Sequence, residues 1–278
     1  MAKTEFDASW QNWISTNVQR GCSKDQLYRI LLDEGFDADA ITAVLAHRPS
    51  LHPSLIVNPL KQPAVTISAS PVRSGAQAPT PERIPTLRAL PTSRLEIYVA
   101  ENFLTGQECR EIVDLMQSSL RESTITTPGD PDKYFRVSKT CDLGQIHHPA
   151  VGRLDKKICT ALDTNEAFSE PTQGQHYDPG GEFKPHTDTF EAHELPQFMT
   201  PTLGQRSWTF MIYLNQPEAG GETHFVNAGL SVQPKEGMAV IWNNLLPDGR
   251  PNIDSMHHGT PVKAGHKDII TKWFRVAR

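Results

Sequence analysis

A histidine and an aspartate separated by one residue, His186 and Asp188, are the first candidates for chemistry in this chain. If they lie on a β-strand, residues i and i+2 point to the same face, so both side chains can reach into one interior. One imidazole and one carboxylate suit a divalent first-row metal, and a second histidine would complete a facial triad that leaves coordination positions open. The pair is therefore a candidate for two metal ligands, but the spacing on its own favours a chance occurrence on the surface, so the interpretation depends on finding the third ligand.

Two candidates for the missing ligand, His257 and His258, lie together near the C-terminal end of the chain. His257 follows His186 by 71 residues and precedes a stretch, 268–276, with the pattern of a strand. Because successive residues of a strand face opposite ways, only one of the two histidines can face the same interior as His186 and Asp188. The spacing within the pair leaves the choice between them open.

Several longer stretches resemble the prolyl 4-hydroxylase-type 2-oxoglutarate dioxygenases. The resemblance covers about residues 94–276, and its motifs occur in the order and at the spacing of the family. The matching stretches are 102–109, 121–124, 136–140, 175–188, 206–215, 220–223 and 257–273. The resemblance implies a double-stranded β-helix, the jelly-roll of cupin-like enzymes. It also implies that the protein binds Fe(II) and uses 2-oxoglutarate and O₂ as cosubstrates, with ascorbate as a further candidate cofactor.

The resemblance also assigns roles to single residues. In the family, the distal histidine stands ten residues before the lysine that binds 2-oxoglutarate, which selects His257 as the third ligand and Lys267 as the lysine. A cation at the closed end of the barrel can pair with the distal carboxylate of 2-oxoglutarate through a charge-assisted contact. Tyr177 and Thr223 stand where the family supplies hydroxyl groups to the same carboxylate. His258 is then expected to face away from the metal.

Two residues near the expected substrate entrance, Arg206 and Trp273, match positions that peptide-binding members of the family use. The match favours a substrate with carbonyl oxygens for the guanidinium to bind and an apolar ring to stack. Two other positions depart from the family pattern. Phe183 stands where a substrate-facing tyrosine often lies, and Arg275 stands where peptide hydroxylases often have histidine. An extra cation at the mouth would suit the carboxylate of a small acid.

The presence of Asp188 separates two reaction types, because halogenating members of the superfamily replace this carboxylate with a small residue. The resemblance therefore implies hydroxylation of an unactivated C–H bond, most favourably in a prolyl residue of a peptide or protein. One alternative is a hydroxylase or oxidative cyclase of a free amino acid or small natural product. Another is a non-catalytic binding protein on the same fold, and the retention of the three ligands and Lys267 opposes it.

The elements that must position these residues are predicted over 94–278, which we interpret as an α+β catalytic domain. Thr105 can cap a helix, and residues 151–162 indicate a second one. Helices followed by many short strands are typical of a sandwich or barrel buttressed on one side by helices. The predicted strands are 95–99, 209–214, 224–226, 238–242 and 268–276, separated by turns rich in Gly, Pro and Asn.

Residues 1–48 predict a small helical unit. Ser23 begins a capping box, and Leu27, Ile30 and Leu31 follow at helical intervals. The Gly-Phe loop after this helix resembles that of ubiquitin-associated-type domains. Together with Trp10 and Trp13, these side chains form more apolar surface than about 48 residues easily bury alone. We therefore expect the unit to contact either a protein partner or, preferably, the catalytic domain.

Residues 49–93 change in composition. They hold nine of the 22 prolines of the chain among Ser, Thr and Ala. Because proline removes a backbone donor and blocks helix, this segment predicts a linker or extended arm.

The overall composition excludes several classes of protein. A formal net charge of −5, with both signs dispersed, argues against nucleic-acid binding. The apolar runs are shorter than the roughly 20 residues of a membrane span, and the first residues lack the pattern of a secretory signal. The four cysteines lie far apart without a C-x-x-C pair, which predicts reduced thiols in a cytoplasmic protein.

Overall fold

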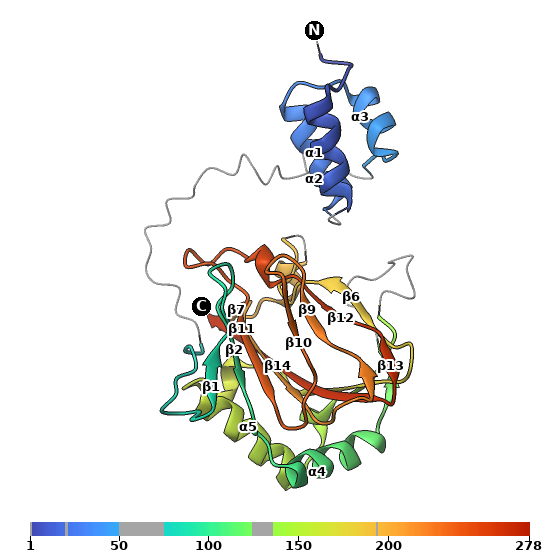
Figure 1. The fold of residues 1–278 in the computed structure, drawn as a ribbon. Helices are drawn as coiled ribbons and strands as arrows, with labels where there is room; N and C mark the ends of the chain where they lie inside the picture. The colour runs from blue at the N-terminus through green and yellow to red at the C-terminus, as the bar shows by residue number, and fades with distance from the viewer. Residues whose placement is uncertain (1, 20–21, 50–74, 124–135, 193) are drawn as a thin grey trace. The chain divides into compact units, whose positions relative to one another are not determined.

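A computed structural model describes residues 2–19, 22–49, 75–123, 136–192 and 194–278 (Figure 1). The chain divides into two compact units, Met1–Ser68 and Ala69–Arg278. Within the described ranges, no helix combines the length and the apolar composition needed to cross a membrane. Most of the predicted arm, residues 50–74, lies outside the described residues, and the boundaries expected at 48 and 93 stay predictions.

The first unit contains three helices, α1 (Ala8–Gln19), α2 (Lys24–Asp33) and α3 (Ala38–Leu45). The hydroxyl of Ser23 caps α2, and the carboxylate of Asp37 caps α3 by accepting two backbone N–H groups. One apolar cluster holds the helices together. Its buried members are Ile14, Leu27, Tyr28, Leu31, Phe36, Ile41 and Leu45.

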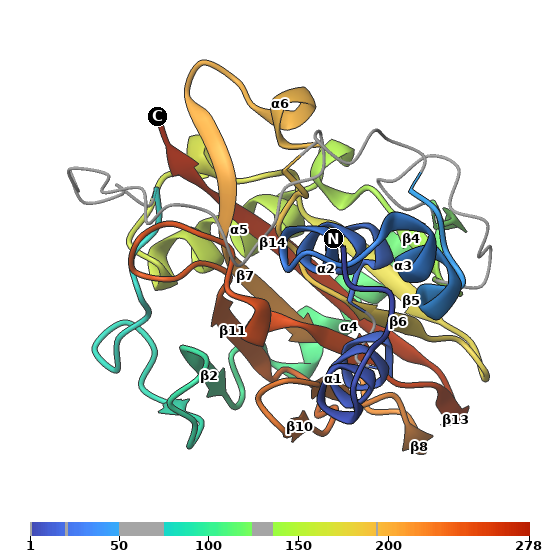
Figure 2. The same ribbon diagram turned by 90° about the horizontal axis from the view of Figure 1, so that it is seen from above.

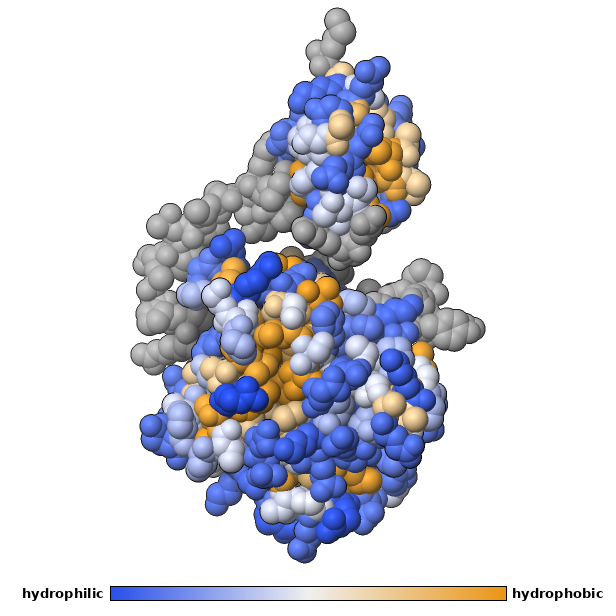
Figure 3. Space-filling model, in the orientation of Figure 1, coloured by the Kyte–Doolittle hydropathy of each residue, from blue (hydrophilic) through white to orange (hydrophobic). Residues whose placement is uncertain are grey.

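The apolar side chains of this unit are buried more completely than its length suggests. Leu27 is 2% exposed and Leu31 is 0% exposed. Phe36 belongs to the same cluster, and its ring stacks on Phe6 at 4.3 Å between centroids and meets Trp10 edge-on at 5.2 Å. Trp10 and Trp13 are only partly buried, so the expected contact of this unit with another surface stays a prediction. Some apolar surface remains exposed: Figure 3 shows apolar residues gathered on the side where α3 lies.

An eight-stranded antiparallel sheet is the main element of the second unit. Its strand order is β1-β2-β11-β7-β14-β5-β4-β3. The strands are β1 (Leu87–Ala89), β2 (Ile97–Ala100), β3 (Arg121–Glu122), β4 (Lys139–Cys141), β5 (Gln173–Tyr177), β7 (Leu203–Tyr213), β11 (Ala239–Asn243) and β14 (Lys267–Ala277). The two longest strands, β7 and β14, pair with each other at the centre of the sheet.

A four-stranded antiparallel sheet, ordered β10-β9-β12-β6, faces the interior side of the large sheet. Its strands are β6 (Phe183–His186), β9 (Thr223–Phe225), β10 (Leu230–Val232) and β12 (His257–Gly259), and β8 (Ala219–Gly220) pairs with β13 (Val262–Ala264) beside it. The short helices are η2 (Leu143–Gln145), η3 (Glu166–Phe168), α6 (Leu195–Phe198) and η4 (Ile253–Ser255).

Alternation along β7 divides the second unit into two apolar layers. Phe210 and Ile212 belong to the cluster that packs on α4 (Gly106–Gln117) and α5 (Pro149–Ala161), which cover one face of the large sheet (Figures 1 and 2). Met211 and Tyr213 point the other way, into the space between the two sheets. The predicted α+β class, with helices buttressing a β-sandwich, is confirmed.

The described end of the predicted arm packs on the second unit. Gln77 N–H donates to the carbonyl of Leu162 at 2.8 Å, and Gly75 N–H donates to that of Arg275 at 3.2 Å. Further along, β1 adds an edge strand to β2. Backbone hydrogen bonds therefore attach residues 75–93 to the second unit. The prolines of this segment lie at other positions and do not interrupt these bonds.

Candidate active site

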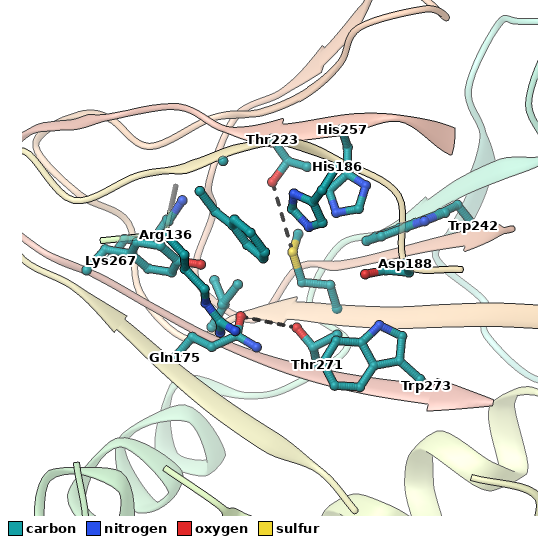
Figure 4. A pocket seen from close by; sticks show the side chains of 15 residues that line it. Arg136, Gln175, His186, Asp188, Thr223, Trp242, His257, Lys267, Thr271 and Trp273 are labelled. Carbon is teal, nitrogen blue, oxygen red and sulfur yellow. Dashed lines mark hydrogen bonds between the residues drawn. The ribbon is translucent and has the colours of Figure 1, made fainter. Parts of the chain in front are cut away.

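Three predicted ligands meet between the two sheets. His186 ends β6 and lies opposite His257, the first residue of β12, in the antiparallel register. Asp188 follows two residues after His186, beyond the end of the strand. One possible ligand atom from each side chain lies within 4.8 Å of the others, and the described residues contain no other such group of three (Figure 4). The structure thus brings together the predicted triad.

Backbone carbonyls orient both imidazoles. His186 Nδ1 lies 2.7 Å from the carbonyl of Lys184, and His257 Nδ1 lies 3.0 Å from that of Ser255. A carbonyl only accepts, so each Nδ1 must carry the proton and each Nε2 keeps its lone pair. Burial, followed by the neighbouring imidazole of His257, lowers the pKa of His186 well below its usual value. The neutral form, which a metal requires, is therefore favoured.

Aromatic rings enclose these imidazoles. Phe183 stacks on His186 with 3.5 Å between centroids and 19° between planes. Trp242 meets His257 edge-on at 4.9 Å. The rings limit rotation of both histidines and keep water from their apolar sides.

The neighbouring histidine, His258, lies on the opposite face of β12. Its Nε2 is 3.0 Å from the carboxylate of Glu182, and its strand neighbour His224 bonds the hydroxyl of Ser231. Strand alternation therefore directs His257, and not His258, toward His186. This placement agrees with the expectation drawn from the ten-residue spacing.

Lys267 is a buried cation in the same pocket. Its side chain is 1% exposed, and Nζ donates to the carbonyl of Gly221 at 3.0 Å. Among the described residues, no carboxylate lies within ion-pair distance of it. Burial lowers its pKa to about 8, and the more distant charge of Glu222 opposes this shift. An ammonium has three donors, so this lysine lacks partners that an anion could supply.

Tyr177 and Thr223 line the pocket with Lys267. Tyr177 is the register partner of Lys267 across β5 and β14, and its ring centroid is 4.4 Å from the lysine Nζ. Burial raises the pKa of Tyr177, so its hydroxyl stays protonated at neutral pH. The Thr223 hydroxyl is 2.5 Å from that of Tyr213, which is fully buried. Both predicted residues therefore line the same pocket as Lys267.

One pocket contains both the three metal-binding candidates and Lys267 with Tyr177 and Thr223. Figure 4 shows the three metal-binding candidates at one end and Lys267 at the other. The pocket also contains residues to which the sequence assigned no role: Arg136, Gln175, Met211, Trp242, Ile269 and Thr271. Strand alternation could have predicted three of them. Gln175 is two residues before Tyr177 on β5, and Ile269 and Thr271 are two and four residues after Lys267 on β14, so all three face the same side as those residues. Arg136 lies within a family-matching stretch, which was the available signal for it.

Comparisons with known proteins agree with this arrangement. The model of the 2OG-Fe(II) oxygenase superfamily matches residues 172–275. The chain is 34% identical over 200 residues to prolyl 4-hydroxylase 5 of Arabidopsis thaliana. The matched region covers 64% of this chain and 67% of that protein. The chain belongs to the prolyl 4-hydroxylase family. The resemblance drawn from the sequence motifs is thereby confirmed.

Other relatives match a smaller part of their length. The chain is 34% identical over 177 residues to prolyl 4-hydroxylase subunit alpha-1 of Homo sapiens, covering 62% of this chain but only 33% of that subunit. It thus spans about a third of such relatives. A solved structure, the viral collagen prolyl hydroxylase of Paramecium Bursaria Chlorella virus-1 in a 2OG complex, shares the fold with a TM-score of 0.52. That structure is 24% identical and covers 66% of this chain and 96% of its own.

Arg206, predicted from the sequence to bind substrate, is already paired within the protein. Its Nε and Nη2 donate to the two carboxylate oxygens of Glu170 at 2.8 and 2.6 Å, and Nη1 donates to the carbonyl of Asp188 at 3.2 Å. The guanidinium lies 4.1 Å from the ring of Trp273. Trp273 lines the pocket, and its buried Nε1 has no hydrogen-bond acceptor within the described part of the chain. Arg206 therefore braces this tryptophan.

Arg275 does not line the pocket, although its position departs from the family pattern. Its donors are bound by the carboxylate of Glu170 at 3.0 Å, the carbonyl of Gly204 at 2.6 Å and that of Phe198 at 2.8 Å. Two arginines thus share Glu170. The interpretation of Arg275 as a free cation for a small acid finds no support, because protein acceptors occupy its nitrogen atoms.

Proposed function

We propose that this protein is an Fe(II)- and 2-oxoglutarate-dependent dioxygenase that hydroxylates an unactivated C–H bond of a prolyl residue in a peptide or protein. The observation that carries this proposal is the combination, in one pocket, of a two-histidine, one-carboxylate cluster and a buried lysine for which the described residues supply no carboxylate partner. Neither feature is useful to the fold, since burying unpaired polar groups costs free energy. Each is explained by a ligand.

The donor set fits Fe(II). Two neutral imidazole nitrogens and one carboxylate are the facial triad typical of non-haem Fe(II) oxygenases, and they leave positions open. When bound there, Fe(II) would supply O₂ activation coupled to the oxidative decarboxylation of 2-oxoglutarate. His186, Asp188 and His257 would hold the ion, while Phe183 and Trp242 exclude water from its surroundings.

The opposite end of the pocket fits the distal carboxylate of 2-oxoglutarate. The ammonium of Lys267 has unfilled donors, and Tyr177 and Thr223 line the same pocket. Charge-assisted hydrogen bonds in a shielded site are the stronger kind, so these three side chains would anchor the acid. Anchoring this end points the oxo-acid end of the molecule toward the triad, as Figure 4 lets the reader follow.

The mouth of the pocket favours a peptide over a small acid. Trp273 lines the pocket, and its buried indole N–H has no acceptor among the described residues, so a peptide carbonyl that reached it would satisfy it. Arg206, stacked on the tryptophan, has its Nε and Nη2 held by Glu170, so a peptide would meet a braced aromatic wall. The matched relatives are prolyl 4-hydroxylases by name, which supports the same substrate class.

Mass spectrometry of a proline-peptide library tests this proposal. We expect incubation with Fe(II), 2-oxoglutarate, O₂ and ascorbate to add one oxygen atom to proline in a subset of peptides. The addition should require 2-oxoglutarate and should be absent from the Asp188→Ala variant. If free amino acids gain oxygen and no peptide does, the alternative of a small-molecule hydroxylase replaces this proposal. If 2-oxoglutarate is not consumed under any condition, the enzymatic proposal itself fails.

We propose that the helical unit of residues 1–48 is an accessory that contacts a protein partner or the catalytic domain. Its own apolar cluster supports a separately folded unit, and every candidate site residue lies in the second unit. A shortened chain beginning at Ala69 should therefore keep slow conversion of 2-oxoglutarate to succinate. A folded but inactive shortened chain would contradict this. An unchanged melting temperature would favour a protein partner, whereas a lower one would favour contact with the catalytic domain.

A further inference from the structure

A chain of two buried hydrogen bonds leads from Asp188 to the end of β11. Thr209, on the interior face of β7, is 0% exposed, and its hydroxyl lies 2.6 Å from Asp188 Oδ2. Asn244 is also 0% exposed, and its Nδ2 donates to the same hydroxyl at 2.8 Å. None of the roles described above uses Thr209 or Asn244.

The direction of these bonds follows from the donor types. An amide NH₂ only donates, so it occupies a lone pair of the Thr209 hydroxyl. The hydroxyl proton then has Asp188 Oδ2 as its acceptor, so the two hydrogen bonds run in one direction, from Asn244 through Thr209 to Asp188. The backbone of Asn244 is also held by hydrogen bonds. Its backbone N–H donates to the carbonyl of Ser207 at 2.7 Å, and its backbone carbonyl accepts from the backbone N–H of Asn252 at 2.8 Å.

We propose that Thr209 and Asn244 are positioning residues that select which oxygen of Asp188 ligates the metal. The inference rests on the proposed function. Thr209 engages Oδ2, and among the described residues no hydrogen bond is made to Oδ1, so Oδ1 is the oxygen presented to the ion. The backbone of Asp188 is fastened separately, through its carbonyl, by Arg206. Both fastenings are needed because Asp188 lies beyond the end of β6, where no ladder holds it.

This arrangement makes Asp188 a ligand through one oxygen. A carboxylate whose second oxygen is free can rotate and bind the metal through both oxygens, which consumes an open position. With Oδ2 held by Thr209, that rotation would break a short hydrogen bond in a buried site. The open positions required by the cosubstrates are thereby kept.

Metal binding, measured without substrate, tests the proposal. We expect Thr209→Val to weaken anaerobic Co(II) affinity by about 10- to 100-fold, as loss of groups that orient ligands does in other metal sites. The visible spectrum of bound Co(II) should change, because a carboxylate that binds through two oxygens alters the coordination. Thr209→Ser, which keeps the hydroxyl, should restore both. Asn244→Ala, which does not touch Asp188, should give the same changes to a smaller degree and serves if the valine variant fails to fold.

A matched control lies elsewhere in the same unit. Thr172 is 0% exposed, donates to Asp155 at 2.5 Å and accepts from Lys272 Nζ at 3.2 Å, so Thr172→Val loses the same kind of bond. It should leave Co(II) affinity unchanged. Wild-type affinity and spectrum in a folded Thr209→Val variant would overturn this inference alone. Absence of Co(II) and Fe(II) binding in the wild type would instead overturn the proposed function.

Discussion

In the His257→Ala variant we expect 2-oxoglutarate turnover to fall to background, as also in His186→Ala and Asp188→Ala, whereas His258→Ala keeps a substantial part. The physical reason is that a facial triad has no spare protein ligand. Losing one ligand lowers the affinity for the metal ion and leaves an additional coordination position open. His258 faces Glu182 on the other side of β12, where its loss removes one partly exposed ion pair. Such pairs contribute about 0–1 kcal/mol to stability.

Two measurements separate loss of the metal from loss of the fold. Succinate formation reports turnover, and the melting temperature with and without Fe(II) under anaerobic conditions reports binding. The wild type and His258→Ala should be stabilised by Fe(II), and the three ligand variants should not. Full activity in His257→Ala together with loss in His258→Ala would show that the register of β12 is wrong.

For Lys267→Ala we expect a large rise in the KM for 2-oxoglutarate, with a smaller effect on turnover at saturation. Losing a charge-assisted contact in a shielded pocket costs about 1.5–3 kcal/mol or more. That cost corresponds to a rise of about tenfold to more than a hundredfold. Steady-state kinetics with varied 2-oxoglutarate measures it, and Lys263→Ala, an exposed lysine on β13, is the control. An unchanged KM would mean that another cation anchors the acid, and Arg136 in the pocket lining would be examined first.

The depressed pKa of Lys267 adds a pH dependence to this contact. Its pKa is lowered to about 8 by burial. Below that pH the amine is protonated and can pair with the carboxylate, whereas above it the unliganded protein holds a neutral amine. The affinity for 2-oxoglutarate should therefore fall as pH rises above about 8. A Lys267→Arg variant that still binds should lack this fall, because arginine keeps its charge throughout the range. A pH-independent wild-type affinity would contradict the assignment.

The sequence was informative wherever chemistry depends on near neighbours. The one-residue spacing of His186 and Asp188 predicted a shared face, and the resemblance to the family, in which the lysine stands ten positions after the distal histidine, selected His257 from the adjacent pair. Cap residues marked two helix starts, at Ser23 and Thr105, where the structure places α2 and α4. These patterns were readable because strand alternation and helix capping are local properties of the chain.

Contacts between distant segments were not readable. Glu170 binds both Arg206 and Arg275, and this pairing reverses the interpretation of Arg275 as an open cation. Periodicity assigns a residue to a face of its strand, but the residue that meets it depends on the register and packing of other strands.

The N-terminal unit shows the same limit for apolar packing. Leu27 and Leu31 are buried in one cluster with Phe36, whereas Trp10 and Trp13 are only partly buried against it. Composition counts apolar side chains without saying how their shapes fit together.

The sequence by itself determined the family, the reaction class it implies and the residue types that would hold a metal and a dicarboxylate. Only the tertiary structure decided what surrounds them: the rings that contact the two imidazoles, the lack of a carboxylate partner for Lys267 among the described residues, and the hydrogen bond from Thr209 to Asp188. The physical reason is that ligand identity is carried by residue type and local spacing. Burial, charge pairing and ligand orientation arise from groups far apart in the chain, which are brought together when the two sheets close on each other.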